Sequence, residues 1–288
     1  MPANSPRHRF TAILTILLAA PIALAQRPGG MPSTPAPSTP PPSQTPPPDL
    51  NATVPSQPTV APPSKEEGKA IKAFRDTPTS DADKKTQLGE QFIDKYPQSR
   101  YRPEVVNWLA TAYANKAQLD KLQAEGDKEL ELKPQNPLSL ALLGSNMARV
   151  INGQTPDEQK RLDQAQLYSQ AAIDALQKEQ KPESVRQDKF GAATKETSAI
   201  AHSGLGIAAF RRGKYADAVT NLDEAVKNGG DKDPVNLYVL AKANEAQTNF
   251  DPALAAYTKC AAVASGPMQS ACQEGVKEMK SHGAVIPK

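Results

Sequence analysis

Small and large apolar residues recur at fixed intervals in residues 205–226, which read LGIAAFRRGKYADAVTNLDEAV. Leu-Gly-x-Ala comes first, a short polar segment follows, and Tyr, Ala, Leu and Ala then recur every three or four residues. Spacings of three and four residues place side chains on one face of an α-helix. The pattern therefore predicts two short helices joined by a tight turn at RRGKY.

From Ser64 onward the chain is rich in Ala, Leu, Lys, Glu and Gln, all of which favour helix. No stretch alternates polar and apolar positions with β-branched residues for long enough to predict a strand. Helix starts are marked by a capping box or by a capping side chain next to proline, at Ser64, Asn136, Thr155, Asp233 and Asp251. The sequence therefore predicts an all-α fold.

The helix pairs repeat along the chain. Leu-Gly at residues 205–206 recurs 35 residues later as Leu-Ala, and Leu-Ala at residues 109–110 recurs 34 residues later as Leu-Gly. In the second helices, Tyr215-x-x-Ala218 corresponds to Phe250-x-x-Ala253. We expect the small residue of each first helix to leave room for a large side chain from a neighbouring helix. A period of this length is typical of helical repeat proteins.

These intervals resemble those of the tetratricopeptide repeat (TPR) family, from roughly Ser64 to Ser281. The resemblance implies a right-handed superhelical solenoid of helix-turn-helix repeats over residues 64–288, ending in a capping helix. Two insertions, residues 152–163 and 178–197, depart from the repeat. We expect them to lengthen helices or to form a loop on one edge.

Proteins of the TPR family usually bind peptides or partner domains along the concave surface formed by the first helices of successive repeats. In the register above, the resemblance implies that this groove is lined by Ser203, Ile207, Phe210, Arg211, Tyr238, Lys242 and Glu245. Asn107, Thr111 and Ser145 would lie further back along the same surface. The mixture is neither strongly basic nor strongly apolar. It also lacks the paired Lys and Asn residues of the family's carboxylate clamp.

The residues ahead of the repeats fall into two segments. A basic head with Arg7 and Arg9, followed by an apolar run to residue 25, predicts a Sec-type signal peptide at residues 1–25. A retained membrane anchor is the alternative, although Pro21 interrupts the apolar run. Residues 26–63 contain fourteen of the 28 prolines and predict a disordered linker. We therefore expect an exported protein, periplasmic or secreted, with no membrane span after cleavage.

Charge and motifs narrow the choice of ligand. Loss of residues 1–25 removes Arg7, Arg9 and no acidic residue, which leaves 32 basic side chains against 31 acidic ones. This balance gives no reason to expect a nucleic-acid partner. Residues 204–209, GLGIAA, fit a dinucleotide-binding fingerprint only as a string, because helix rather than strand is predicted before them. His202 and His282 have no companion at metal-binding spacing. We expect neither a cofactor nor a metal.

Cys260 and Cys272 are the only two cysteines. Exported chains with an even number of cysteines commonly oxidise them. The turn at Gly266-Pro267 would place the two flanking helices antiparallel, with the cysteines on facing sides. A disulfide that pins the capping helix is therefore expected, and a pair of free buried thiols is the alternative.

The sequence as a whole predicts a non-catalytic scaffold or adaptor of the bacterial cell envelope that binds a protein or peptide partner. A self-associating structural component of an envelope assembly is the alternative, and the oligomeric state stays open. An enzyme is the third reading, but the sequence displays no nucleophile–base pairing, metal set or phosphate-binding loop that favours it.

Overall fold

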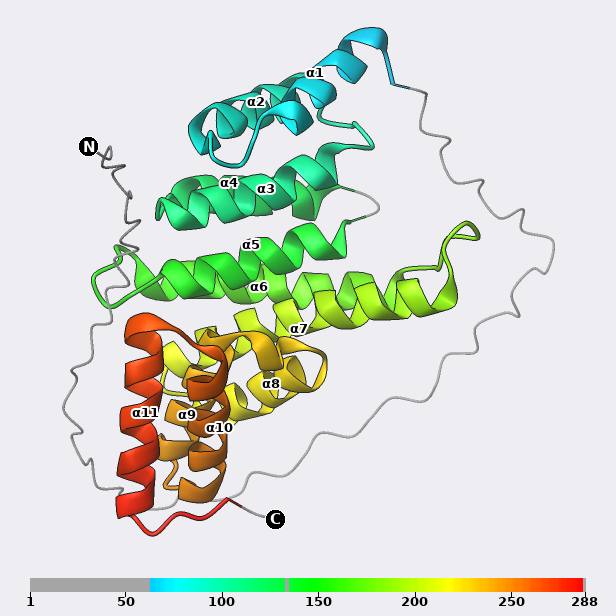
Figure 1. The fold of residues 1–288 in the computed structure, drawn as a ribbon. Helices are drawn as coiled ribbons and strands as arrows, with labels where there is room; N and C mark the ends of the chain where they lie inside the picture. Colours follow the sequence, from blue (N-terminus) through cyan, green and yellow to red (C-terminus); the bar gives the residue numbers. More distant parts are fainter. Residues whose placement is uncertain (1–62, 133–134, 287–288) are drawn as a thin grey trace, which may run out of the picture. The chain divides into compact units, whose positions relative to one another are not determined.

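The computed structural model describes residues 63–132 and 135–286. The predicted signal peptide at residues 1–25 and all of the predicted linker except Pro63 lie outside the described residues. The described residues form α-helices and one short 3₁₀ helix with no strand among them, which confirms the predicted all-α class (Figure 1). The elements are α1 (Lys65–Asp76), α2 (Ala82–Lys95), α3 (Arg102–Asn115), α4 (Leu119–Glu131), α5 (Pro137–Val150), α6 (Glu158–Lys178), α7 (Gln187–Arg211), α8 (Tyr215–Lys227), η1 (Gly230–Lys232), α9 (Pro234–Ala246), α10 (Phe250–Val263) and α11 (Gly266–Ser281).

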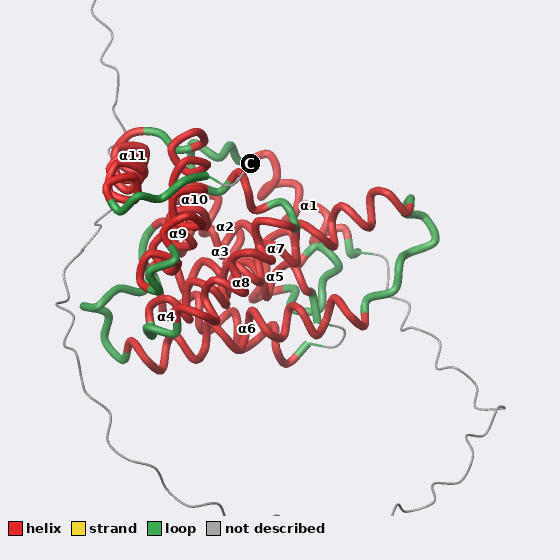
Figure 2. Tube along the Cα trace, turned by 90° about the horizontal axis from the view of Figure 1, so that it is seen from below, coloured by secondary structure: helices red, strands yellow, loops and turns green. Residues whose placement is uncertain are grey.

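The helices pack in consecutive pairs. Each even-numbered helix packs against the odd-numbered helix before it, from α1–α2 to α9–α10, and α11 packs on α10. The odd-numbered helices also contact one another in order, α3 with α5, α5 with α7 and α7 with α9. Figure 2 shows α4 and α6 on one side of α3, α5 and α7. The first helices from α3 to α9 therefore form one continuous layer.

Three of the helix pairs share the same turn. One residue in each turn has a left-handed backbone, with φ of 52° at Ala117, 70° at Gly213 and 60° at Thr248. The next N–H donates to the carbonyl five residues earlier, at 2.9 to 3.0 Å: Gln118 to Tyr113, Lys214 to Ala209 and Asn249 to Asn244. This is the Schellman arrangement, which ends a helix by satisfying its last carbonyls. Glycine suits the position best, yet only one of the three turns has it.

The predicted caps at Ser64, Asn136 and Asp233 are confirmed. Their side-chain oxygens accept hydrogen bonds of 2.9 to 3.1 Å from backbone N–H groups of Glu67, Ser139 and Val235, respectively. Each bond satisfies a donor that the first turn of a helix leaves free. These helices therefore begin where local side-chain chemistry places them.

The predicted caps at Thr155 and Asp251 are wrong. Helix α6 begins only at Glu158, and the Thr155 hydroxyl accepts a bond from the Asn152 N–H within the preceding loop. Helix α10 begins at Phe250, because the left-handed turn at Thr248 closes directly before it. The Asp251 carboxylate instead accepts the N–H of Val285, at 2.8 Å, and holds the C-terminal segment.

The two insertions lengthen helices and also form loops, so both expected outcomes occur. Helix α6 has 21 residues and α7 has 25, whereas α5 before them has 14. The remaining inserted residues form the connections 151–157 and 179–186. The lengthened ends of α6 and α7 project beyond α5 (Figure 1).

Small residues allow the helices to approach closely, as the repeat predicts. Gly206 and Ala241 are both buried, and a Cβ added at Gly206 would lie 2.6 Å from Cγ of Leu222 on α8. Ser169 of α6 occupies the space beside two other glycines, Gly144 of α5 and Gly204 of α7. Leu222 thus fills the space that the missing side chain leaves, and the glycines serve packing rather than phosphate binding.

Candidate partner-binding surface

Two of the predicted groove residues are almost fully buried. Ser203 and Ile207 on α7 are only 1 % and 2 % exposed. Ile207 belongs to the main apolar core, and the Ser203 hydroxyl donates to Asn236 of α9 at 2.5 Å. The packing of α7 against both α5 and α9 buries these two side chains, although Ser203 still borders the cavity described below.

Phe210 and Arg211 are half-buried at the end of α7. The Phe210 ring lies 5.7 Å from the ring of Tyr215, just past the turn. The Arg211 guanidinium donates at 3.0 Å to the carbonyl of Ala148 in the last turn of α5. This bond satisfies a carbonyl that the helix end leaves free, so Arg211 serves chiefly to join α7 to α5.

Tyr238, Lys242 and Glu245 lie together on α9. The Lys242 ammonium forms an ion pair of 2.8 Å with Glu245, whose carboxylate also accepts the hydroxyl of Tyr257 at 2.6 Å. The Tyr238 ring packs edge-on against the Tyr257 ring at 6.0 Å. Burial and the hydrogen bond to Glu245 raise the pKa of Tyr257 above its usual range. The charges of this group are therefore neutralised within α9 and α10.

Further back, the first helices carry a line of polar side chains. The Ser139 hydroxyl of α5 donates to Asn107 of α3 at 3.1 Å, and Ser145 accepts from the guanidinium of Arg149 at 3.3 Å. Thr111 of α3 stands 34 residues before Ser145 and is exposed. In the repeat register, Thr111 and Ser145 therefore occupy equivalent positions on successive first helices.

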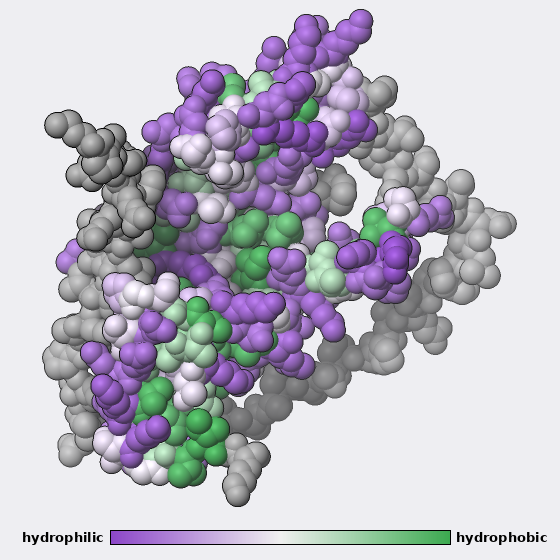
Figure 3. Space-filling model, in the orientation of Figure 1, coloured by the Kyte–Doolittle hydropathy of each residue, from purple (hydrophilic) through white to green (hydrophobic). Residues whose placement is uncertain are grey.

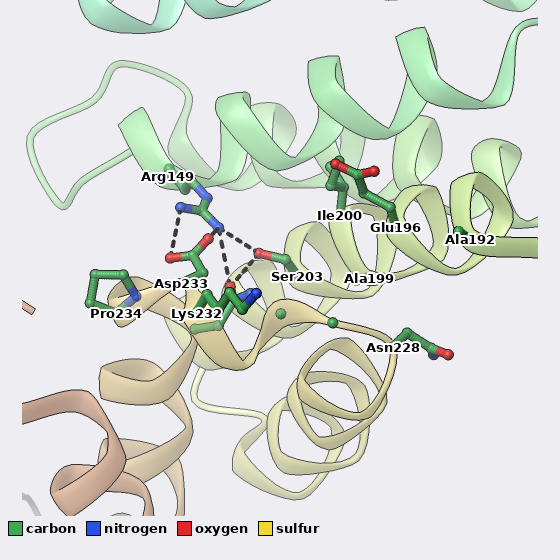
Figure 4. A pocket seen from close by; sticks show the side chains of 13 residues that line it. Arg149, Ala192, Glu196, Ala199, Ile200, Ser203, Asn228, Lys232, Asp233 and Pro234 are labelled. Carbon is green, nitrogen blue, oxygen red and sulfur yellow. Dashed lines mark hydrogen bonds and ion pairs between the residues drawn. The ribbon is translucent and has the colours of Figure 1, made fainter. Parts of the chain in front are cut away.

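A polar junction joins three first helices at Arg149 (Figure 4). Its guanidinium forms an ion pair of 2.5 Å with Asp233, the capping residue of α9, and donates to Ser203 of α7 at 2.9 Å. It also donates to Asn236 of α9 at 3.1 Å. Bonds that share an ionised partner are stronger than neutral ones, so this junction fixes α5, α7 and α9 relative to one another.

Arg149 was not among the residues predicted from the sequence. It lies in the last turn of α5, four residues after Ser145, where a basic side chain also suits the helix end. Its main partner, Asp233, is 84 residues away. Nothing local in the sequence indicates a contact over that separation, and only the cap at Asp233 could be predicted.

A cavity of about 670 Å³ opens beside the junction. This volume lies within the range of about 300–1,000 Å³ that is common for ligand sites. The surface is hollowed below α5 and above α9–α11, with apolar side chains gathered next to the hollow (Figure 3). The cavity is lined by α5, α7 and the α8–α9 connection, chiefly by Arg149, Glu196, Ile200, Ser203, Lys232 and Asp233.

The polar groups at the junction end of the lining are paired with one another. Arg149 is neutralised by Asp233, and the Ser203 hydroxyl is turned to Asn236. Across residues 63–132 and 135–286, no three His, Cys, Asp or Glu side chains gather closely enough to hold a metal ion. His202 lies elsewhere on α7, where a ring nitrogen is 3.1 Å from the side-chain oxygen of Asn221.

The two cysteines are joined in the structure. A disulfide links Cys260 of α10 to Cys272 of α11, and their Cα atoms are 5.8 Å apart. Both side chains are buried against Leu237 of α9. The link fastens α11 to the two helices before it.

None of the helices in the described part of the chain has the length and apolar character needed to cross a bilayer. No protein-family model matches the chain, and no curated protein matches it.

Proposed function

We propose that this chain is an exported, non-catalytic interaction scaffold of the bacterial cell envelope, which binds a protein or peptide partner. Its folded part is a right-handed superhelical solenoid of TPR-like repeats, and its partner binds along the concave surface of the first helices. A cleaved signal peptide at residues 1–25 and a Pro-rich linker at residues 26–63 carry it out of the cytoplasm and separate it from its attachment point.

Recurring geometry supports the repeat architecture. The same left-handed turn stands at Ala117, Gly213 and Thr248, and a small residue, Ala or Gly, stands at the equivalent position of the first helices α3 to α9. The contacts between successive first helices favour a stack in which every repeat touches its neighbours. Such a stack exposes one continuous inner surface.

The open cavity at the Arg149 junction is the observation that carries the binding role. Three first helices, from different parts of the chain, converge there around a hollow of ligand size. The junction itself is satisfied internally, so it holds the walls in place whether or not a partner is present. A pre-formed surface of this kind binds without the cost of ordering loops.

The alternative role, self-association, has a specific feature against it. The outer faces of the two terminal helices are polar, with Lys65, Lys69 and Lys72 exposed on α1 and Glu274 and Lys277 exposed on α11. Polar terminal helices cap a repeat stack and keep it from growing end to end. A sedimentation mass equal to one chain from 1 to 100 times a starting concentration supports the scaffold, and a mass that grows over this series supports self-association.

Binding along the first helices is tested with a matched pair of variants. Thr111 of α3 and Thr220 of α8 are both exposed, and both donate to the carbonyl four residues earlier. We expect Thr111→Arg to lose the proteins that co-purify with the wild-type chain from envelope extract, and Thr220→Arg to retain them. Equal retention by both variants contradicts binding on the first-helix surface.

A further inference from the structure

A groove runs between one face of α7 and the connection from α8 to α9. On α7 it is lined by Ala192, Glu196, Ala199, Ile200 and Ser203, which are three, four or one residue apart and so share a helix face. The opposite wall is formed by residues 228–230 and 232–234. Figure 4 shows Ala192 and Asn228 towards one end of this groove and Arg149 towards the other.

The groove is built from the parts of the chain that depart from the regular repeat. Ala192 and Glu196 lie on the inserted residues that lengthen α7 at its start. The other wall includes η1 (Gly230–Lys232), which lengthens the connection before α9. A regular repeat would lack the Ala192–Glu196 part of the α7 wall and η1 in the other wall, so the full length of the groove is a feature of this chain.

One end of the groove is closed and electrically neutral. Arg149 and Asp233 pair there at 2.5 Å, and the Asp233 carboxylate also accepts the N–H of Val235. Ser203 and Asn236 are bonded to each other and to Arg149. Because these groups bond to one another and join α5, α7 and α9, this end of the groove has no unpaired charge with which a ligand could interact.

Two charged side chains along the groove are not paired in this way. Neither Glu196 on α7 nor Lys232 on η1 has an ion-pair or hydrogen-bond partner within the described residues, and both are exposed. Ala199 and Ile200 line the same wall as Glu196, and Pro234 lines the wall of Lys232. The groove therefore presents an acidic position on one wall, a basic position on the other and small or apolar side chains on both.

The length of the groove suits an extended chain. The eleven residue steps of helix from Ala192 to Ser203 span about 16 Å. About five residues of extended peptide cover the same distance. A phosphate-rich ligand is disfavoured, because the Glu196 carboxylate would repel it and the Arg149 guanidinium is already paired with Asp233.

We propose that this groove binds an extended segment of about five residues from a partner protein. The segment carries a Lys or Arg side chain that pairs with Glu196 and, next to it, small apolar side chains that pack on Ala199 and Ile200. An acidic side chain further along pairs with Lys232. The inference rests on the proposed function, since it names the partner chemistry of the same first-helix surface.

The probe is a phage-displayed library of random twelve-residue peptides, selected on the purified chain. We expect the selected peptides to be enriched in Lys or Arg beside small apolar residues. Synthetic copies of them should lose affinity by about tenfold or more for Glu196→Lys, because an attractive pair becomes a repulsive one. Glu183→Lys, at an exposed position in the 179–186 connection, is the matched control and should leave the affinity unchanged.

A second pair of variants tests the position of the site without relying on charge. Ala192 and Ala193 are adjacent and exposed on α7, but only Ala192 lines the groove. Ala192→Trp should fill the groove and abolish peptide binding, and Ala193→Trp should not, while both variants keep the wild-type circular dichroism.

The outcomes separate the groove from the broader role. If the selected peptides bind Ala192→Trp and the wild type with equal affinity, the groove is not their binding site. Binding elsewhere on the first-helix surface would remain possible in that case. Selected peptides without basic residues overturn the assigned partner chemistry. Failure to select any peptide, together with full retention of co-purifying proteins by Thr111→Arg, overturns both proposals.

Discussion

Leu222 of α8 fills the space that a side chain at Gly206 of α7 would need. A Cβ placed on Gly206 would lie 2.6 Å from Leu222 Cγ and 3.2 Å from the Leu222 backbone nitrogen. The second of these neighbours is backbone and cannot turn away. The distance between the two helices is therefore set by the absence of a side chain at one position.

Gly206→Ala should destabilise the fold. We expect a loss of about 1–3 kcal/mol in the free energy of unfolding, because overpacking forces the helices apart. The matched control is Gly191→Ala in the same helix, where an added Cβ meets nothing within 4 Å. That control should gain about 0.5–1 kcal/mol from the higher helix propensity of alanine. Urea unfolding followed by circular dichroism measures both changes, and a Gly206→Ala variant as stable as Gly191→Ala would contradict the packing.

Thr248→Gly should stabilise the protein, although it removes a side chain. Thr248 is a β-branched residue with φ of 60°, a conformation that costs about 1–3 kcal/mol in non-glycine residues. Glycine removes most of this conformational cost, but it also raises the conformational entropy of the unfolded chain, which offsets part of the gain. We expect a net rise in melting temperature, with a fall for the reciprocal variant Gly213→Thr. A fall in both variants would show that the turn at Thr248 is not strained.

The three turns illustrate which features the sequence predicts and which it does not. The turn at Gly213 can be predicted because glycine favours a left-handed backbone, and the helix caps at Asn136 and Asp233 can be predicted from their side chains. The turn at Thr248 cannot be predicted, because no side chain there favours it. As a result, the sequence predicts the cap of α10 at Asp251, two residues after the observed cap at Asn249, and does not indicate the role of the Asp251 carboxylate.

The candidate site was predicted less well than the fold. The repeat register assigns Ser203 and Ile207 to the groove, but the contacts of α7 with α5 and α9 bury both. Arg149, which reaches across 84 residues to Asp233, also joins these three helices. Helix periodicity describes one pair of helices at a time, and a junction among three helices is beyond what it encodes.

Stability should also depend on pH through Glu129. Arg102 pairs with Glu125 at 3.0 Å and Glu129 at 2.9 Å, and all three side chains are buried. Burial raises the pKa of Glu129 above its usual value of 4.5, so the folded state binds a proton more readily than the unfolded state. Stability therefore falls as the pH rises from 4.5 through the raised pKa, since the buried group must then carry its charge.

Glu129→Gln should remove this dependence, because glutamine stays neutral. We expect the stability of the variant, relative to the wild type, to increase as the pH rises through the same window. Glu131→Gln, at an exposed position two residues on, serves as the control and should follow the wild type. If the stability of Glu129→Gln relative to the wild type decreased with rising pH, the pKa of Glu129 would be lowered rather than raised in the folded state. Denaturant titrations at several pH values decide between the two.

The disulfide between Cys260 and Cys272 closes a loop with a separation of 12 residues. Its reduction should lower the free energy of unfolding by at most about 3 kcal/mol. The Cys260→Ala, Cys272→Ala double variant should show the same loss without reductant. Mass spectrometry after alkylation of the denatured chain should find no labelled thiol unless reductant is added first. Two labelled thiols in the unreduced chain would mean that the cysteines are free.

Photo-crosslinking along the chain tests the central claim, that a partner binds on the surface of the first helices. A photoreactive phenylalanine analogue is placed at Thr111 of α3 or at Thr220 of α8, both exposed, and the cells are illuminated. The account predicts a covalent adduct with another protein from position 111 and none from position 220. An adduct from position 220 alone would place the partner on the second helices and contradict the account.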